Sequence, residues 1–188
     1  QHLLDIVAQR RASQRPPRTI DVVVPVYRDR AATLAAIDSV RAGGGDFELV
    51  VINDASPDAG LTADLRARAD RSEFTLLTNP ENCGFVASAN RGLQLHPDRD
   101  VVLLNSDTVV PPGWLDRLAR AARADLVGTV TPFSNNATIA SYPVPLEANP
   151  LPEGWTVAEL DSVFRDANAG WQIDLPTAVG FCMYIRRD

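Results

Sequence analysis

Short apolar runs alternate with helix-forming segments between Ile20 and Val130, and this alternation limits the possible folds more than any other feature of the chain. The runs are rich in β-branched residues and predict strands, and the segments between them have helical spacing. The predicted strands are 20–26, 47–52, 74–77, 101–104 and 126–130, and the predicted helices are 31–41, 61–69, 86–95 and 114–124. Such short spacing is typical of an α/β domain with a mainly parallel sheet and helices on both faces.

The two ends of this domain follow a different pattern. Residues 1–18 predict an N-terminal helix and a proline-containing linker, so the domain itself covers 19–188. Residues 131–176 are rich in proline and asparagine with little periodicity, which favours a functional loop system. Residues 177–186 predict one more strand. Since the chain begins with a glutamine, we expect further sequence, and further domains, in the full-length protein.

Composition argues against several classes of function. The net charge of −6 gives no general affinity for nucleic acid. No apolar run is long enough to span a bilayer, and the start shows no secretory signal. Cys83 and Cys182 make neither a disulfide framework nor a zinc site, so we expect reduced thiols and a cytoplasmic protein. His2 and His96 have no metal-ligand spacing and are interpreted as surface residues.

Polar clusters follow four of the predicted strands, at 25–27, 53–58, 79–85 and 105–107. The carboxyl ends of parallel strands share one edge of a sheet, and open α/β sheets bind their ligands there. We therefore expect the four clusters to form one polar pocket, covered by the irregular segment 131–176.

Each cluster alone also has a purely structural explanation. One of residues 106–108 could cap a helix that begins near Pro111, and residues 53–58 could form a turn that caps the next helix. Asn90 could be an exposed helix residue, and Gly84 could serve either an unusual backbone angle or close approach of a ligand.

Asp107 is the candidate metal ligand. It follows the apolar run 101–104, which predicts a buried strand. The chain contains neither a GxGxxG nor a GxxxxGK[ST] phosphate loop, so a bound diphosphate would need a cation to neutralise its charge. A carboxylate at a strand end can hold Mn²⁺ or Mg²⁺ for this purpose.

In this order, the four motifs resemble those of a family 2 glycosyltransferase. The resemblance covers about residues 19–188 and is carried by Val22–Tyr27, Val51–Asp58, Asn79–Asn90 and Leu103–Pro112. It implies the GT-A fold and metal-assisted transfer of a sugar, with inversion, from a nucleotide diphosphate to a glycan or lipid-linked acceptor. Gly180–Arg187 and Ser134–Thr138 resemble the rhamnosyltransferase-like branch.

The resemblance also implies roles for individual residues. Pro25 and Tyr27 match the strand end that contacts the nucleotide, and Asp54 matches the acid that hydrogen-bonds a pyrimidine base, as in UDP or dTDP. Residues 105–107 match the DxD motif, in which Asp107 binds the metal and an amide replaces the first acid. The predicted nucleotide-sugar site comprises Pro25, Tyr27, Asp54, Asn82, Gly84, Asn90, Asn105, Ser106 and Asp107.

The resemblance places the general base after the Gly180 strand. We expect this base to lie beyond Asp188, so that the chain given binds donor but transfers sugar poorly. Two other functions stay open: a nucleotidyltransferase, and a catalytically silent module that binds nucleotide sugar or carbohydrate. We expect a cytoplasmic protein, which the full-length chain could hold at the inner face of the membrane.

Overall fold

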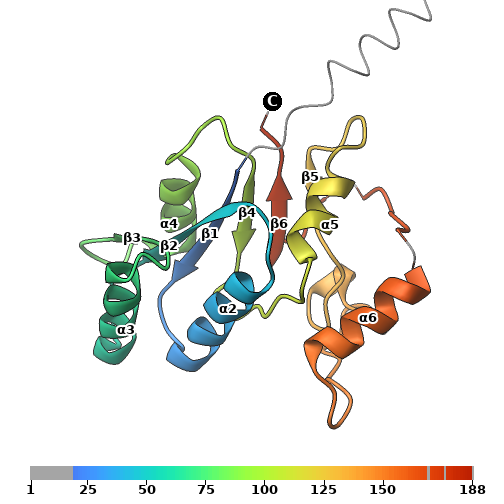
Figure 1. The fold of residues 1–188 in the computed structure, drawn as a ribbon, viewed down its shortest axis with the longest axis horizontal. Helices are drawn as coiled ribbons and strands as arrows, with labels where there is room; N and C mark the ends of the chain where they lie inside the picture. Colours follow the sequence, from blue (N-terminus) through green and yellow to red (C-terminus); the bar gives the residue numbers. More distant parts are fainter. Residues whose placement is uncertain (1–18, 169, 176, 188) are drawn as a thin grey trace, which may run out of the picture.

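The computed structural model describes residues 19–187 apart from 169 and 176, and the predicted N-terminal helix and linker lie outside the described residues. The core is a six-stranded sheet with the order β3-β2-β1-β4-β6-β5 (Figure 1). Its strands are β1 (Ile20–Val26), β2 (Phe47–Asn53), β3 (Thr75–Thr78), β4 (Val101–Leu104), β5 (Thr129–Val130) and β6 (Cys182–Ile185). Strands β1 to β4 are parallel, whereas β6 runs antiparallel to both β4 and β5. The predicted mainly parallel α/β sheet is confirmed.

Helices cover both faces of this sheet. They are α2 (Arg30–Ala42), α3 (Ala59–Asp70), α4 (Gly84–Leu93) and α5 (Trp114–Ala121), whereas α6 (Val157–Asn168) lies beside the sheet and has no buried residue. Alternate strand residues point to opposite faces, so Val22 and Val24 join one apolar cluster and Val23 joins the other. Helices α2, α3 and α5 contribute to the first cluster, and α4 contributes to the second.

Helix α4 lies very close to the sheet at Gly92. A Cβ atom on this residue would come within 2.4 Å of Val23 Cγ1, which no side chain could accept without a shift. The contacts of α4 are with β1 and β2. The second half of α4 is thereby held against β1 and β2.

The predicted strand 126–130 is wrong over most of its length, since β5 contains only Thr129 and Val130. Leu126 has a φ of +66° and is fully exposed, because it lies in the turn that follows α5. Arg186 Nη1 donates to the carbonyls of Ala122 and Ala124, which holds this turn beside β6. The last predicted strand, 177–186, is likewise shorter and corresponds to β6.

The prediction that residues 131–176 lack regular structure is also wrong, because α6 lies within them. Prolines and asparagines on both sides of the helix dominate the composition of the segment and hide its helical spacing. Thr156 begins the helix with a capping box, in which the Thr156 N–H and hydroxyl both donate to Glu159 Oε2.

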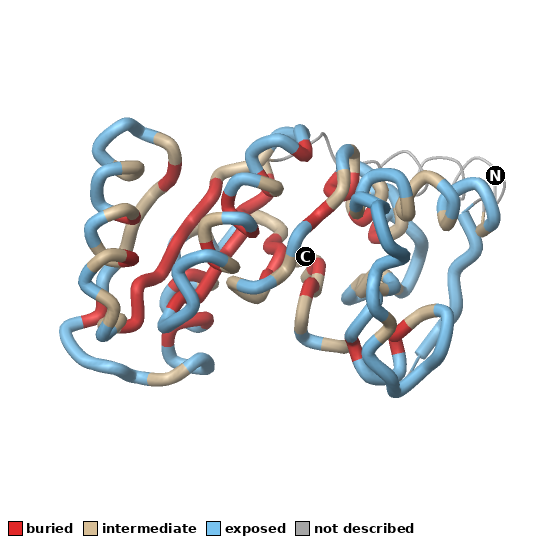
Figure 2. The backbone as a smooth tube through the Cα atoms, turned by 90° about the horizontal axis from the view of Figure 1, so that it is seen from below, coloured by how far each residue is buried: buried red, intermediate tan, exposed pale blue. Residues whose placement is uncertain are grey.

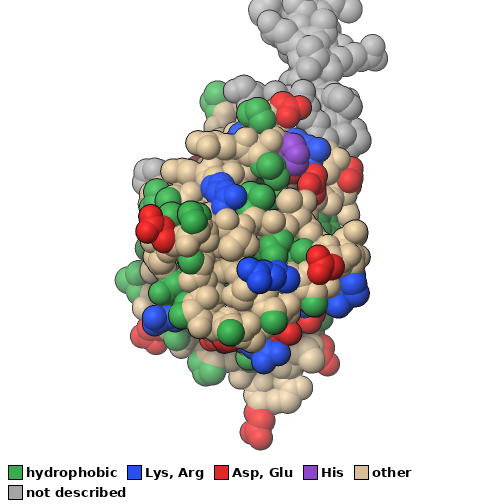
Figure 3. Space-filling view, turned by 90° about the vertical axis from the view of Figure 1, so that its left-hand side faces the viewer, with side chains coloured by type: hydrophobic (Ala, Val, Ile, Leu, Met, Phe, Trp, Pro, Cys, Tyr) green, Lys and Arg blue, Asp and Glu red, His purple; other side chains and the backbone are tan. Residues whose placement is uncertain are grey.

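The part of this segment before α6 is ordered by hydrogen bonds. Asn135 Nδ2 donates to the Asn149 carbonyl, and Asn149 N donates to the Asn135 carbonyl. The segment lies to one side of the sheet, below α5 and β6, and is mostly exposed (Figures 1 and 2). On the face at the β3 edge, basic and acidic side chains are interspersed without a broad patch of one sign (Figure 3).

Candidate functional site

The polar clusters that follow β1, β2, β3 and β4 converge on the carboxyl edge of the sheet, as predicted. The strand order β3-β2-β1-β4 also sets the spatial order of the clusters across this edge, which is Asn79, Asp54, Tyr27 and then Asn105. Backbone hydrogen bonds of 2.8 Å fix neighbouring clusters to one another: Asp54 N donates to the Val26 carbonyl, and Asn79 N donates to the Asn53 carbonyl. The convergence follows from parallel strands that end at the same level.

The edge opens between β1 and β4. Their pairing stops at Val23 opposite Leu103, and Pro25, which has no N–H to donate, follows two residues later. The chain builds β2 and β3 on one side of β1 and β4 on the other, so this gap is the topological switch point of the sheet. Ligands of open α/β sheets bind at such a point. Tyr27 and Asn105 follow the two strands that flank it.

Asp54 is buried at this edge, with 3% of the residue exposed, and both carboxylate oxygens accept hydrogen bonds. Oδ1 accepts from Asn79 Nδ2 at 2.6 Å and from Cys83 N at 2.8 Å. Oδ2 accepts from Gly84 N at 2.8 Å. These backbone donors lie at the start of α4, where unpaired N–H groups and the helix dipole favour a negative charge. Asp54 therefore fixes the start of α4 from another strand.

The pKa of Asp54 lies below its ordinary value of 3.8. Burial raises the pKa, but hydrogen bonds from Cys83, Asn79, Ser88 and Gly84 together lower it by more. Since these donors favour the charged form, the carboxylate is ionised at neutral pH.

The turn after β2 combines two roles that the sequence left as alternatives. Asp58 caps α3 by accepting from Leu61 N at 3.0 Å, and Asn53 Oδ1 accepts from Ser56 N at 2.9 Å. The turn-and-cap interpretation is therefore right for these residues. It does not account for Asp54, whose partners belong to the segment after β3.

Gly84 has a φ of +82°, and a Cβ atom there would meet open space. Of the two reasons predicted for this glycine, the structure shows the unusual backbone angle, which turns the Gly84 N–H toward Asp54. Cys83 beside it is exposed, and Cys182 is buried in β6; both are free, as predicted.

Three residues around Asp54 were missing from the predicted site: Asn79, Ser88 and Arg91. Asn79 Nδ2 donates to Ser88 Oγ at 2.9 Å as well as to Asp54, and Arg91 Nη1 donates to Asn79 Oδ1 at 2.6 Å. Ser88 and Arg91 are three positions apart on α4, which puts both on one side of the helix. That spacing was the only signal in the sequence.

Asp107 differs from Asp54 in its burial and in its hydrogen bonds. It is exposed, and no described side chain hydrogen-bonds its carboxylate. The cap interpretation of residues 106–108 is wrong: α5 begins at Trp114, and its N-cap is Gly113 without a side-chain cap bond. Asn105 N donates to the Phe181 carbonyl at 2.8 Å, so the segment before β6 lies beside this motif.

Of the remaining predicted residues, Pro25 is buried in β1, Asn105 and Ser106 are partly buried, and the others lie at the surface. Tyr27 is partly exposed, and the Arg28 guanidinium lies 4.9 Å from its ring centroid. Asn82 is exposed in the loop before α4. Asn90 is exposed two turns into α4, roughly 9 Å along the helix axis from Gly84. The structure therefore brings Asn79, rather than Asn90, next to Asp54, and Arg91 contacts Asn79.

Comparison with known proteins assigns the chain to a family. The model of glycosyl transferase family 2 matches residues 21–188. The chain belongs to this family. We found no curated protein whose sequence matches it.

Solved structures confirm the GT-A fold. A mannosyltransferase from Pyrobaculum calidifontis, in complex with GDP-Man and Mn²⁺, is 21% identical with a TM-score of 0.52, over 70% of this chain and 43% of its own. S. aureus TarS 1-349 in complex with UDP is 16% identical with a TM-score of 0.55, over 72% and 38%. GalNAc-T7 with UDP, GalNAc and Mn²⁺ is 18% identical with a TM-score of 0.51, over 64% and 23%. The chain thus spans less than half the length of these glycosyltransferases.

The oxygen atoms after β4 fit a hard divalent cation. Asp107 offers an exposed carboxylate, and the side chains of Asn105 and Ser106 offer neutral oxygens. Mg²⁺ and similar ions accept one or two carboxylates and complete their shell with water and substrate phosphates. With a single carboxylate, the site would depend on a diphosphate for most of its charge.

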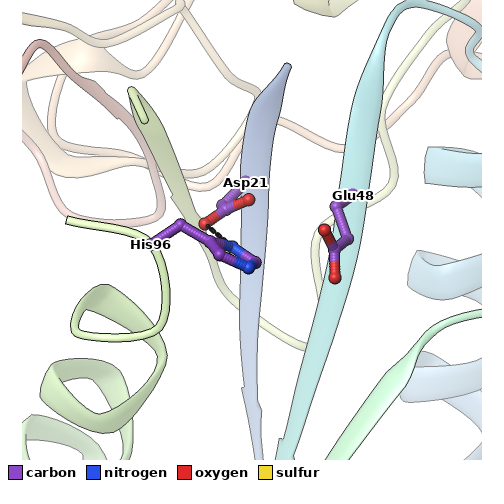
Figure 4. A group of neighbouring side chains, drawn as sticks. All are labelled: Asp21, Glu48 and His96. Carbon is purple, nitrogen blue, oxygen red and sulfur yellow. Dashed lines mark hydrogen bonds and ion pairs between the residues drawn. The ribbon is translucent and has the colours of Figure 1, made fainter. Parts of the chain in front are cut away.

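A second group of possible metal ligands lies at the opposite, amino edge of the sheet. Ligand atoms of Asp21, Glu48 and His96 lie within 4.8 Å of one another (Figure 4). Arg99 Nη1, however, donates to Asp21 Oδ1 at 3.0 Å and to Glu48 Oε2 at 2.7 Å. One guanidinium thus holds both carboxylates and balances one of their two charges, so we interpret the group as an ion-pair network. His96, predicted as a surface residue, is partly buried here, with its Nδ1 2.8 Å from Asp21 Oδ2.

No helix in the described part of the chain is long and apolar enough to cross a membrane.

Proposed function

We propose that this chain carries the donor site of an inverting, metal-assisted glycosyltransferase that uses a UDP- or dTDP-linked sugar. One observation carries the proposal: in a family 2 chain, Tyr27, Asp54 and Asn105–Asp107 follow β1, β2 and β4 on the carboxyl edge that contains the switch point. We assign Pro25, Tyr27 and Asp54 to the nucleoside and Asp107, with Mn²⁺ or Mg²⁺, to the diphosphate. Asn82, Gly84 and Asn90 stay predicted members of the same site.

The assignment of Asp54 to the base rests on its charge and rigidity. A carboxylate held by backbone N–H groups keeps its position before a ligand arrives, and it accepts a ring N–H of uracil or thymine. The metal, when bound, would neutralise charge on the diphosphate leaving group. With the base held at Asp54 and the diphosphate held at Asp107, on the two sides of the gap between β1 and β4, the donor can bind in one orientation.

In the proposed reaction, an acceptor hydroxyl attacks the anomeric carbon from the face opposite the phosphate. The bond from this carbon to the diphosphate breaks, the diphosphate leaves with the electron pair, and a carboxylate base takes the hydroxyl proton. We assign that base to none of the described residues, and its position after Asp188 stays a prediction. The acceptor is a glycan or a lipid-linked acceptor in this proposal, and the protein is cytoplasmic, where the full-length chain could hold it at the inner face of the membrane.

Titration calorimetry with UDP, dTDP and GDP, each with and without Mn²⁺, tests the proposal. We expect UDP or dTDP to bind most tightly and Mn²⁺ to strengthen binding. Failure of all three nucleotides to bind would reject the donor site. A transfer assay on this chain and on one extended past Asp188 then separates an enzyme from a silent binding module, since only the enzyme releases free nucleotide diphosphate with the acceptor present.

A further inference from the structure

Asn79 is a buried amide at the end of β3 whose two ends are held by opposite charges. Its Nδ2 donates to Asp54 Oδ1 at 2.6 Å, and its Oδ1 accepts from Arg91 Nη1 at 2.6 Å. Ser88 Oγ accepts a further hydrogen bond from Nδ2 at 2.9 Å. Only 6% of Asn79 is exposed, so water can replace none of these partners easily.

The charges at the two ends fix which way the amide faces. The oxygen and nitrogen ends of an amide have nearly the same shape, and only hydrogen-bond partners distinguish them. Arg91 can only donate, so it fixes the oxygen end, and ionised Asp54 can only accept, so it fixes the nitrogen end. Arg91 Nη1 is itself anchored by the Thr78 carbonyl at 2.8 Å.

We propose that Arg91 is a positioning residue for the donor base, acting through Asn79 on the Asp54 carboxylate and thereby on the choice between bases. The inference rests on the proposed function. It requires no contact between Arg91 and the nucleotide, because the guanidinium acts on the far end of the Asn79 amide. Asp107 follows β4, whereas Asn79 follows β3, with β2 and β1 between them, so the effect of Arg91 concerns the base and leaves the diphosphate end unchanged.

The test compares Arg91→Met and Arg91→Lys with the wild-type chain. Methionine keeps the unbranched apolar part of the side chain but cannot donate, so the Asn79 amide loses its fixed orientation. We expect the preferred nucleotide to bind roughly three- to tenfold more weakly, as for one lost hydrogen bond, and the ratio of UDP to GDP affinity to move toward one. Lysine keeps the charge and has donors for both acceptors, but its side chain is shorter and lacks the rigid planar fork, so its ratio should lie between those of wild type and Arg91→Met.

Arg66→Met is the matched control, because Arg66 is an exposed arginine on α3. It should leave the affinities and their ratio unchanged, and the effect of Mn²⁺ should be the same in all four proteins. If the ratio of UDP to GDP affinity in Arg91→Met equals that of wild type, the inference is overturned. An equal loss of both affinities would then show a merely structural role. If Arg91→Met does not fold, the Arg91→Lys ratio decides alone. A wild-type chain that binds no nucleotide would instead reject the proposed function.

Discussion

The two edges of the sheet both contain a buried aspartate, but the partners that stabilise its charge differ. At the amino edge, Asp21 is fully buried and contacts the Arg99 guanidinium and the His96 ring. At the carboxyl edge, Asp54 is almost as buried, yet its donors are two backbone N–H groups and an amide. The first carboxylate is neutralised by a cation, whereas the second keeps its net negative charge among neutral donors.

This difference shows why a group of possible metal ligands is a poor guide to a site. The amino edge has the closer set of carboxylate and imidazole atoms, but Arg99 already satisfies the charge there. The carboxyl edge has only one exposed acid, Asp107, yet its strand ends leave a gap at the switch point. A partly exposed ion-pair network adds modestly to stability, and an unpaired carboxylate beside a gap is available for a ligand.

Among substitutions at the two edges, Asp54→Ala should have the largest effect on stability and nucleotide affinity. The substitution leaves the N–H groups of Cys83 and Gly84 without a partner, which should cost about 1–3 kcal/mol of unfolding free energy. Nucleotide affinity should fall by a further 1–3 kcal/mol, roughly, if the base loses a buried hydrogen bond. Urea unfolding and calorimetry measure the two effects separately.

Asp58→Ala is the control for this prediction, since Asp58 also caps a helix but accepts its hydrogen bond from the helix that follows it directly in the chain. It should cost about 1 kcal/mol of stability and leave nucleotide affinity unchanged. Unchanged UDP and dTDP binding in Asp54→Ala would reject the assignment of Asp54 to the base.

At the amino edge, Asp21→Asn should lower stability without changing nucleotide affinity. The neutral side chain keeps its size but removes the charge that Asp21 presents to Arg99 and His96, at a cost of about 1–2 kcal/mol because Arg99 keeps its ion pair with Glu48 and both partners are partly exposed. Nucleotide affinity and its dependence on Mn²⁺ should match those of wild type. A loss of Mn²⁺ dependence in this variant would show that the metal binds at the amino edge.

Asp107→Asn should have a smaller effect on the fold and a selective effect on binding. The side chain is exposed, so the unfolding free energy should change by less than about 0.5 kcal/mol. In Mn²⁺ the affinity for UDP should fall about tenfold, to the level that wild type shows with EDTA. If neither EDTA nor the substitution changes UDP binding, Asp107 is not a metal ligand.

The sequence predicted the central part of this structure better than its margins, for a physical reason. Strands β1, β2 and β4 are buried on both faces, so their apolar runs directly record their environment. The strand 126–130 failed because a turn with Leu126 at positive φ interrupts an apolar run. Helix α6 was missed because it has no buried residue and lies between stretches rich in proline and asparagine.

The candidate site was predictable only for residues that follow strands. Asp54 and Asp107 stand directly after apolar runs, and the parallel order of the strands brings them to one edge. Arg91 reaches that edge from the second half of α4 through a long side chain, so its contact depends on how the helix packs at Gly92. Packing distances of this kind have no signature in a single sequence.

The smallest expected effect is on acid stability, and it separates the two edges by their response to salt. Burial raises the pKa of Asp54, but its hydrogen bonds lower it below 3.8, while the Arg99 hydrogen bond lowers the pKa of Glu48 below 4.5. Each carboxylate thus contributes stability at neutral pH that is lost as the pH falls through the unfolded pKa toward the lower folded pKa.

Urea unfolding at several values from about pH 6 to about pH 2.5 should therefore show a steeper loss of unfolding free energy in wild type than in Asp54→Asn or Glu48→Gln. Added salt should reduce the contribution of Glu48, because its ion pair with Arg99 is partly exposed and screened. It should leave the contribution of Asp54 nearly unchanged, since the Asp54 donors are neutral and buried. An equal salt response of the two contributions would mean that both edges stabilise their carboxylates by long-range charge, and the distinction between the edges would then be wrong.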